Sequence, residues 1–218
     1  RLEQELSRTV STSYIYKLNE NGSAAVSEET ANLLKAAMDY GAATGGLFDM
    51  TVAPLVSLWG ITTDSPRVPS RSEIDALLPL VGSDRVHLDG QTVTLDAGCA
   101  VDLGGIAKGF TSSRIMEIFK KDGVTCGMVS LGGNVHLLGT KQDGSAWRVG
   151  IQDPNNTDDM LGVLEANDCA VITSGAYERN FEKDGVTYHH IVDPATGKPS
   201  NSGLTSVTIV SKDGTLAD

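Results

Sequence analysis

The stretch Val101-Asp102-Leu103-Gly104-Gly105-Ile106-Ala107-Lys108-Gly109 decides how this chain is organised. It is predicted to begin as a strand and to open a helix, because apolar residues recur with nearly helical spacing from Phe110 to Lys121. Its glycines allow positive φ angles and a close approach of a ligand to the main chain. The free N–H groups at the start of such a helix favour an anionic group such as a phosphate. The structural alternative is a tight turn that Asp102 caps.

Composition limits the classes of function. The chain has 218 residues, a hydrophobic fraction of 40% and a net charge of −11, which suits a globular domain and argues against a nucleic-acid-binding surface. An acidic site still accepts a phosphorylated ligand when a metal ion bridges the two. Cys99, Cys126 and Cys169 are widely spaced and odd in number, so we expect free thiols.

Neither a membrane span nor a signal peptide is visible in the sequence, since no apolar run reaches about 18 residues. The chain begins without Met in a helix-like pattern at Arg1 and ends just after a strand at Asp218. No long linker divides it. We therefore expect a single domain over residues 1–218 that is truncated at both ends.

Local signals predict helices and hairpins. Ser27 and Ser70 are expected to cap helices, the second with a capping box. Asp89-Gly90 and Asp184-Gly185 each lie between β-prone runs and predict hairpins.

Further strands are expected in the second half of the chain. Gly162–Leu164 and Cys169–Ile172 are predicted as a strand pair. The remaining strands are expected at Met128–Leu131, Val135–Leu138, Trp147–Ile151 and Leu204–Val210. Strands mixed with a few helices predict an α+β fold, with mixed, mostly antiparallel sheets and flanking helices.

Two polar runs are candidates for chemistry. Thr173-Ser174-Gly175 lacks the flanking glycine of a serine-hydrolase G-x-S-x-G turn, and a polar substrate-holding loop is the preferred interpretation. His189 and His190 are adjacent, so on a strand their side chains point to opposite faces. One imidazole then faces a site as a proton acceptor, ahead of the turn predicted at Asp193-Pro194.

Five runs together resemble the FAD:protein FMN transferases, the ApbE family of flavin transferases. In chain order they are Thr44–Asp49 (with Pro54 and Trp59-Gly60), Asp102–Gly109, Ser130–Asn134, Thr173–Gly175 and His189–Gly197. Each run alone is weak, but their order and spacing over nearly the whole chain are specific. The resemblance implies an ApbE-like flavin transferase fold.

The resemblance also implies an activity. A Mg²⁺-dependent enzyme breaks the pyrophosphate of its substrate FAD, joins FMN to a Thr or Ser hydroxyl of an acceptor protein, and releases AMP. Such a reaction needs neutralised phosphate charge, an in-line nucleophile and a proton acceptor. The implied acceptors include flavin-carrying subunits of membrane redox complexes. Family analogy implies an extracytoplasmic protein, lipid-anchored to the cytoplasmic membrane.

Site residues carry over position by position. The resemblance implies His190 as general base, and it implies metal contacts from Asp218 and from the main-chain carbonyl of Gly105. The implied FAD-contacting residues are Leu47, Phe48, Asp49, Asp102, Lys108 and Val192. The family's metal motif continues beyond Asp218, where this chain stops.

Two alternatives to transfer remain open. An FAD pyrophosphatase would use water in place of the acceptor hydroxyl and give FMN and AMP. A non-catalytic flavin-binding protein would bind FAD without turnover.

Overall fold

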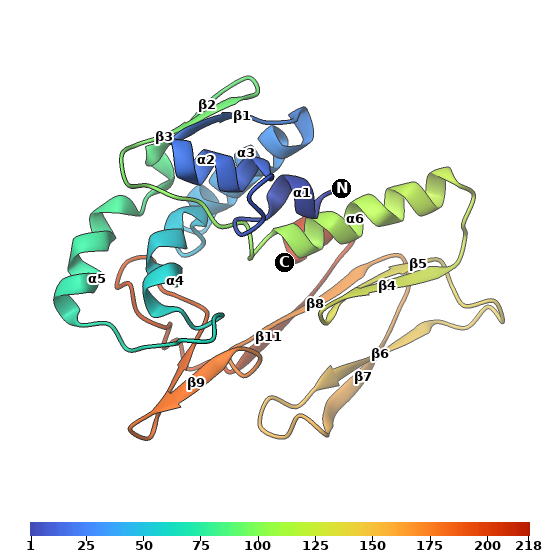
Figure 1. Cartoon of the computed structure of the whole chain (residues 1–218). Helices are drawn as coiled ribbons and strands as arrows, with labels where there is room; N and C mark the ends of the chain where they lie inside the picture. The colour runs from blue at the N-terminus through green and yellow to red at the C-terminus, as the bar shows by residue number, and fades with distance from the viewer. The chain divides into compact units, whose positions relative to one another are not determined.

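The computed structural model describes residues 1–218, which form two compact units. The first unit comprises Arg1–Leu103 and Arg179–Ser202, and the second comprises Gly104–Glu178 and Gly203–Asp218. Every strand pair in the named sheets is antiparallel, and helices accompany the sheets in both units (Figure 1). The predicted α+β class with mostly antiparallel sheets is therefore confirmed.

The first unit begins with helices that the sequence caps as expected. Ser27 accepts a hydrogen bond from the Thr30 main-chain N–H, and Ser70 forms the predicted capping box with Glu73. The helices of this unit are α1 (Glu3–Leu6), α2 (Tyr14–Asn21), α3 (Glu28–Ala43), α4 (Ala53–Trp59) and α5 (Arg71–Leu77), with 3₁₀ turns η1 (Met50–Val52), η2 (Leu78–Leu80) and η3 (Ser83–Arg85).

Two small sheets complete the first unit. The predicted hairpins at Asp89-Gly90 and Asp184-Gly185 are confirmed. The sheets consist of β1 (Ser23–Ala25), β3 (Thr92–Leu95) and β2 (Val86–Asp89) in that order, and of β9 (Asn180–Lys183) with β10 (Val186–His189). Leu55, Trp59 and Ile74 form a buried cluster against which Phe181 and Tyr188 pack. This cluster ties the second sheet to α4 and α5.

The second unit is built on a four-stranded sheet with the order β11-β8-β5-β4. Its strands are β4 (Gly127–Leu131), β5 (Asn134–Leu138), β8 (Ala170–Gly175) and β11 (Ser206–Ser211), and the unit also contains the hairpin β6 (Trp147–Gln152) and β7 (Met160–Ala166) and the helices α6 (Ala107–Lys121) and α7 (Gly214–Ala217). The long helix α6 contacts β5 and β4, and in Figure 1 it runs along them (yellow-green).

Strand β8 is buried on both faces, which explains the unbroken apolar run Cys169-Ala170-Val171-Ile172 that begins one residue before it. Cys169 and Val171 pack with Val149 of β6, whereas Ala170 and Ile172 pack with Ala217 of α7. The period of two along the strand thus joins the sheet to the β6–β7 hairpin on one face and to α7 on the other.

Three predictions of secondary structure were wrong. Residues 101–103 are not a strand, since the Asp102 main-chain N–H donates to the Met50 carbonyl in an isolated contact rather than in a ladder. The strands around residues 162–164 and 169–172 exist but do not pair with each other, because β7 pairs with β6 and β8 pairs with β5 and β11. Thr173–Gly175 ends strand β8 and is not a loop.

The three cysteines are free thiols, as expected, and Cys99 and Cys169 are buried. No helix combines the length and the apolar composition needed to cross a membrane.

Candidate active-site residues

Asp218 is held at the start of α6 in the second unit. Its side chain is 3% exposed, and its Oδ1 lies 2.6 Å from Asn134 Nδ2 and 3.2 Å from Lys108 Nζ. Its Oδ2 accepts the Gly109 main-chain N–H at 2.8 Å. A carboxylate of the chain itself therefore lies at the N-terminus of this helix, where negative charge is favoured.

Glycines bring α6 and α7 together closely enough for this contact. A Cβ atom added to Gly109 would lie 2.6 Å from Asp218 Cβ and still closer to the Gly214 carbonyl oxygen. The Gly214 main-chain N–H also donates to Ser113 Oγ on α6 at 3.1 Å. Only glycine fits at position 109, so the last glycine of the opening stretch serves helix packing.

The oxygen atoms of Asp218 and of the turn at Gly104 attract a cation. The Lys108 ammonium lies 3.4 Å from the Gly104 carbonyl oxygen as well as 3.2 Å from Asp218 Oδ1. Gly105, the other residue assigned to metal, is exposed in the same turn. No group of three or more His, Cys, Asp and Glu side chains is arranged to hold a metal ion. Mg²⁺ usually binds through one or two carboxylates together with waters and substrate phosphates, so Asp218 and the turn carbonyls fit as part of its ligand set.

In the first unit Asp102 forms an ion pair that the sequence did not predict. Its Oδ2 lies 2.8 Å from Arg8 Nε, and the two side chains are 20% and 24% exposed. The charge-assisted contact with Arg8 orients the carboxylate, whose side chain is still partly exposed. Asp102 does not cap α6, whose N-cap position is Ile106.

The run Leu47-Phe48-Asp49 follows a glycine turn in which Gly45 and Gly46 have φ angles of +63° and +84°. Leu47 is 79% exposed, so its side chain is accessible to an apolar ligand. Asp49 has a structural role, because its Oδ1 accepts the Thr51 main-chain N–H at 2.7 Å and begins the turn η1.

His190 follows strand β10 and is partly exposed. Its Nδ1 lies 3.2 Å from the Arg179 carbonyl oxygen, which also accepts the His190 main-chain N–H. A carbonyl only accepts, so Nδ1 carries the proton and Nε2 is the basic nitrogen of the neutral ring. The neighbouring His189 donates from Nε2 to the Ser200 carbonyl at 2.9 Å, and its Nδ1 is the buried side-chain polar atom without a partner.

The turn after His190 is fixed to α4. The Trp59 indole N–H donates to the Gly197 carbonyl at 2.7 Å, and Asp193 Oδ1 accepts the Ala195 main-chain N–H at 2.9 Å. Gly197 has a φ of +67°, and an added Cβ would lie 2.6 Å from Ile74 Cγ2. Val192 packs its side chain against the Trp59 cluster, so its contact with a flavin would come from the main chain.

The nine residues predicted for the site are divided between the two units. Leu47, Phe48, Asp49, Asp102, His190 and Val192 belong to the first unit, and Gly105, Lys108 and Asp218 belong to the second. The structure adds Arg8 and Asn134, which the sequence did not single out as functional. Asn134 ends the Gly132-Gly133-Asn134 run, so a signal was present, whereas nothing around Arg8 indicated a partner.

Comparison with known proteins gives a consistent result. The model of the ApbE family matches residues 1–218. Curated FAD:protein FMN transferases from Vibrio cholerae and Treponema pallidum are 35% and 38% identical, over 100% and 85% of this chain and 69% and 56% of their own lengths. The chain thus spans little more than half of the length of some of these relatives.

Solved structures agree with the family match. The crystal structure of an ApbE protein from Thermotoga maritima is 40% identical and covers 100% of this chain and 72% of its own, with a TM-score of 0.94. The flavin transferase ApbE from Vibrio cholerae is 33% identical and covers 99% of this chain and 71% of its own, with a TM-score of 0.88.

Proposed function

Since the chain belongs to the ApbE family, we propose that it transfers FMN from FAD to a Thr or Ser hydroxyl of a target protein, with release of AMP. The observation that carries this proposal is the family match over residues 1–218. The curated relatives named FAD:protein FMN transferase support the same activity. We further propose that both compact units act as one catalytic domain.

His190 is the proposed general base. In the transfer, the acceptor hydroxyl oxygen attacks the phosphorus on the FMN side of the pyrophosphate, and the bond from that phosphorus to the bridging oxygen breaks. The hydroxyl proton passes to His190, and the bridging oxygen leaves with AMP. The hydrogen bond from Nδ1 to the Arg179 carbonyl supports this role, because it places the ring proton on Nδ1 and makes Nε2 the basic nitrogen.

The remaining residues are proposed to hold FAD and magnesium. Leu47, Phe48, Asp49, Asp102, Lys108 and Val192 are assigned to FAD. Asp218 and the Gly105 carbonyl are assigned to Mg²⁺, which when bound neutralises phosphate charge and polarises the phosphoryl oxygens. The position of the Lys108 ammonium against Asp218 supports a cation site at this corner.

The test is an assay of the full-length gene product with FAD, with and without Mg²⁺ and an acceptor peptide containing Thr or Ser. Mass spectrometry follows AMP, FMN and flavopeptide. Flavopeptide that forms only with acceptor and metal supports transfer. AMP and free FMN without acceptor would indicate a pyrophosphatase, and FAD binding without AMP would indicate a flavin-binding protein.

Location and acceptor are proposals by family analogy. We propose an extracytoplasmic, lipid-anchored protein that modifies a flavin-carrying subunit of a membrane redox complex. Fractionation of cells that produce the full-length gene product tests the location, and recovery in the cytosolic fraction would contradict it.

A further inference from the structure

A cavity of about 310 Å³ lies within the second unit, lined by residues of α6, of β5 and of the segment 212–215. This volume is at the small end of ligand-binding pockets, which span roughly 300–1,000 Å³. Nothing in the proposed transfer uses the cavity. Its lining includes His136, Ser113, Lys120, Lys212 and Thr215.

His136 is the buried polar group of the cavity, with 5% of its surface exposed. Its Nδ1 lies 3.0 Å from Ser112 Oγ, and that hydroxyl donates its proton to the Gly109 carbonyl at 2.8 Å. Nδ1 is therefore the donor toward Ser112, and Nε2 carries the lone pair of the neutral ring. No residue of the chain donates to Nε2, and this nitrogen is not among the fully buried polar atoms, so it is an unpartnered acceptor on a cavity-lining side chain.

Burial lowers the pKa of His136, and the positive charge of Lys120 lowers it further, while Asp213 acts in the opposite direction. The ring is therefore neutral at neutral pH, and its Nε2 is an acceptor. A ligand that satisfies it must bring a donor group, such as a hydroxyl.

The charges around the cavity favour a ligand that is also anionic. Glu117 forms an ion pair with Arg114, and Asp213 Oδ1 accepts the Thr215 and Leu216 main-chain N–H groups. The carboxylates are thus compensated within the protein. Lys120 and Lys212 form no ion pair, so two ammonium groups remain available at the cavity.

Hydroxyl groups add further donors. Ser113 Oγ accepts the Gly214 main-chain N–H, which leaves its own proton for a ligand, and Thr215 Oγ1 has no hydrogen-bond partner in the protein. The cavity therefore combines two cations, two hydroxyl donors and one unpartnered acceptor.

We propose that this cavity binds a protonated oxyanion of the phosphate class, whose P–O⁻ oxygens contact Lys120 and Lys212 and whose P–O–H group donates to His136 Nε2. Hydrogen phosphate and phosphate monoesters carry both groups on one phosphorus atom. Sulfate has the charge but no proton, so it leaves Nε2 unpaired.

The experiment is an NMR titration of the ¹⁵N-labelled full-length protein with inorganic phosphate, at about pH 6.5 where phosphate keeps a P–O–H group. The signals of the His136 ring nitrogens report the site directly, and no flavin is present. We expect a saturable shift of Nε2 and binding of sulfate at least about tenfold weaker than that of phosphate, because sulfate has no proton to donate to Nε2 and presents only acceptor oxygens to its lone pair.

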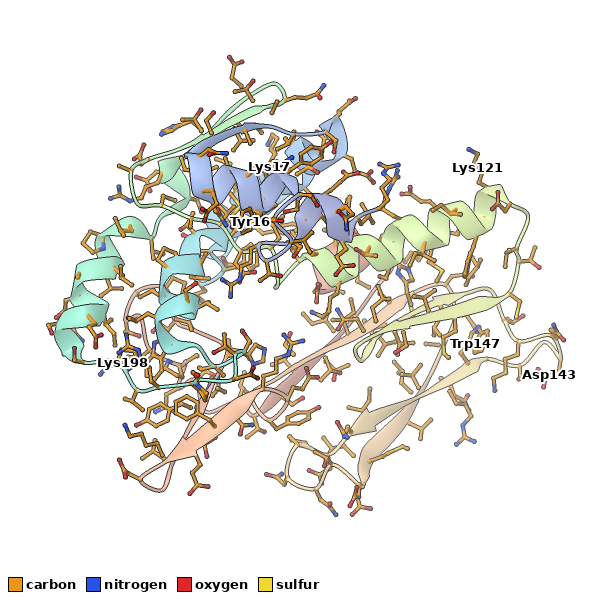
Figure 2. All side chains as sticks on the ribbon, in the orientation of Figure 1. Tyr16, Lys17, Lys121, Asp143, Trp147 and Lys198 are labelled. Carbon is orange, nitrogen blue, oxygen red and sulfur yellow. The ribbon has the colours of Figure 1, made fainter.

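The variants separate this site from general surface charge. The double variant Lys120→Gln/Lys212→Gln is expected to weaken phosphate binding at least about tenfold. Lys121→Gln is the matched control: Lys121 is exposed at the end of the same helix, does not line the cavity, and points away from the strands in Figure 2. Absence of a saturable shift, equal binding of sulfate, or equal losses in the double variant and the control would each overturn the proposal.

Discussion

The two units hold their polar side chains in different ways. In the first unit, Asp102 and Arg8 are 20% and 24% exposed, and His190 is partly exposed with its Nδ1 on one carbonyl. In the second unit, Asp218 is 3% exposed with three donors, and His136 is 5% exposed. Partly exposed groups are accessible to a ligand, whereas buried groups also hold helices together. Substitutions in the first unit should therefore mainly lower the rate of flavin transfer. Substitutions in the second unit should mainly lower the free energy of unfolding.

The largest effect is expected at His190. His190→Ala should lower the rate of flavin transfer by ~10²–10⁴-fold, which is the usual contribution of one positioned base. The midpoint of thermal unfolding should hardly change, because the side chain is partly exposed. Rates measured with acceptor peptide, together with unfolding curves, test both statements.

His87→Ala is the matched control in the same unit. His87 lies on β2 with a side chain that is 57% exposed, and transfer by this variant should equal that of the unmodified enzyme. Full transfer by His190→Ala would mean that another group accepts the proton. A large fall in its unfolding midpoint would remove the contrast between the units.

The next effect is on stability, at Gly109. Gly109→Ala should lower the free energy of unfolding by about 3 kcal/mol, because the added methyl group meets α7 backbone that cannot move aside independently. Gly162→Ala on β7 is the control, since no atom lies within 4 Å of its added Cβ. Urea unfolding of both variants measures the difference, and similar values for the two would show that α6 and α7 are not packed as described.

The two aspartates give a direct comparison between the units. Asp218→Asn replaces a buried carboxylate with an amide whose NH₂ group must face Lys108, Gly109 or Asn134, and should cost about 2 kcal/mol of unfolding free energy. Asp102→Asn removes an ion pair that is more exposed and should cost about 1 kcal/mol or less.

Urea unfolding of the full-length protein measures the loss of unfolding free energy in both variants. Isothermal titration measures the dissociation constant for FAD. Asp102→Asn should weaken FAD binding despite its small effect on stability. An unchanged dissociation constant for FAD would leave Asp102 with a structural role only.

The sequence predicted the local features of this chain well and the distant ones poorly. The caps at Ser27 and Ser70 depend on hydrogen bonds to residues three positions away, so their pattern lies within a few letters of sequence. The contact between Asn134 and Asp218 joins residues 84 positions apart, and only the fold determines it. Likewise, the buried run before and within β8 indicated a strand but not its neighbours, because apolar side chains carry no information about which strand will pair with them.

The smallest expected effect is the pH dependence that His136 contributes. Its pKa in the folded chain is lowered from 6.5, chiefly by burial and then by Lys120, with Asp213 opposing. The other charged groups of its cavity are Lys212, Arg114 and Glu117. The unfolded chain therefore binds more protons below about pH 6.5, and the free energy of unfolding should fall as pH drops from about 7.5 to about 5.

This pH range distinguishes the contribution of His136 to the free energy of unfolding from the contributions of the carboxylates. Glu73, for example, has a pKa lowered from 4.5 to about 2, so its contribution is present above pH 4.5 and is lost only at lower pH. Lys120→Gln should reduce the slope between about pH 7.5 and pH 5, because removing that positive charge brings the pKa of His136 nearer to its value in the unfolded chain. An equal slope in the unmodified protein and in Lys120→Gln would mean that the charge of Lys120 does not lower the pKa of His136, and burial of the ring would then be the sole cause of the lowered pKa.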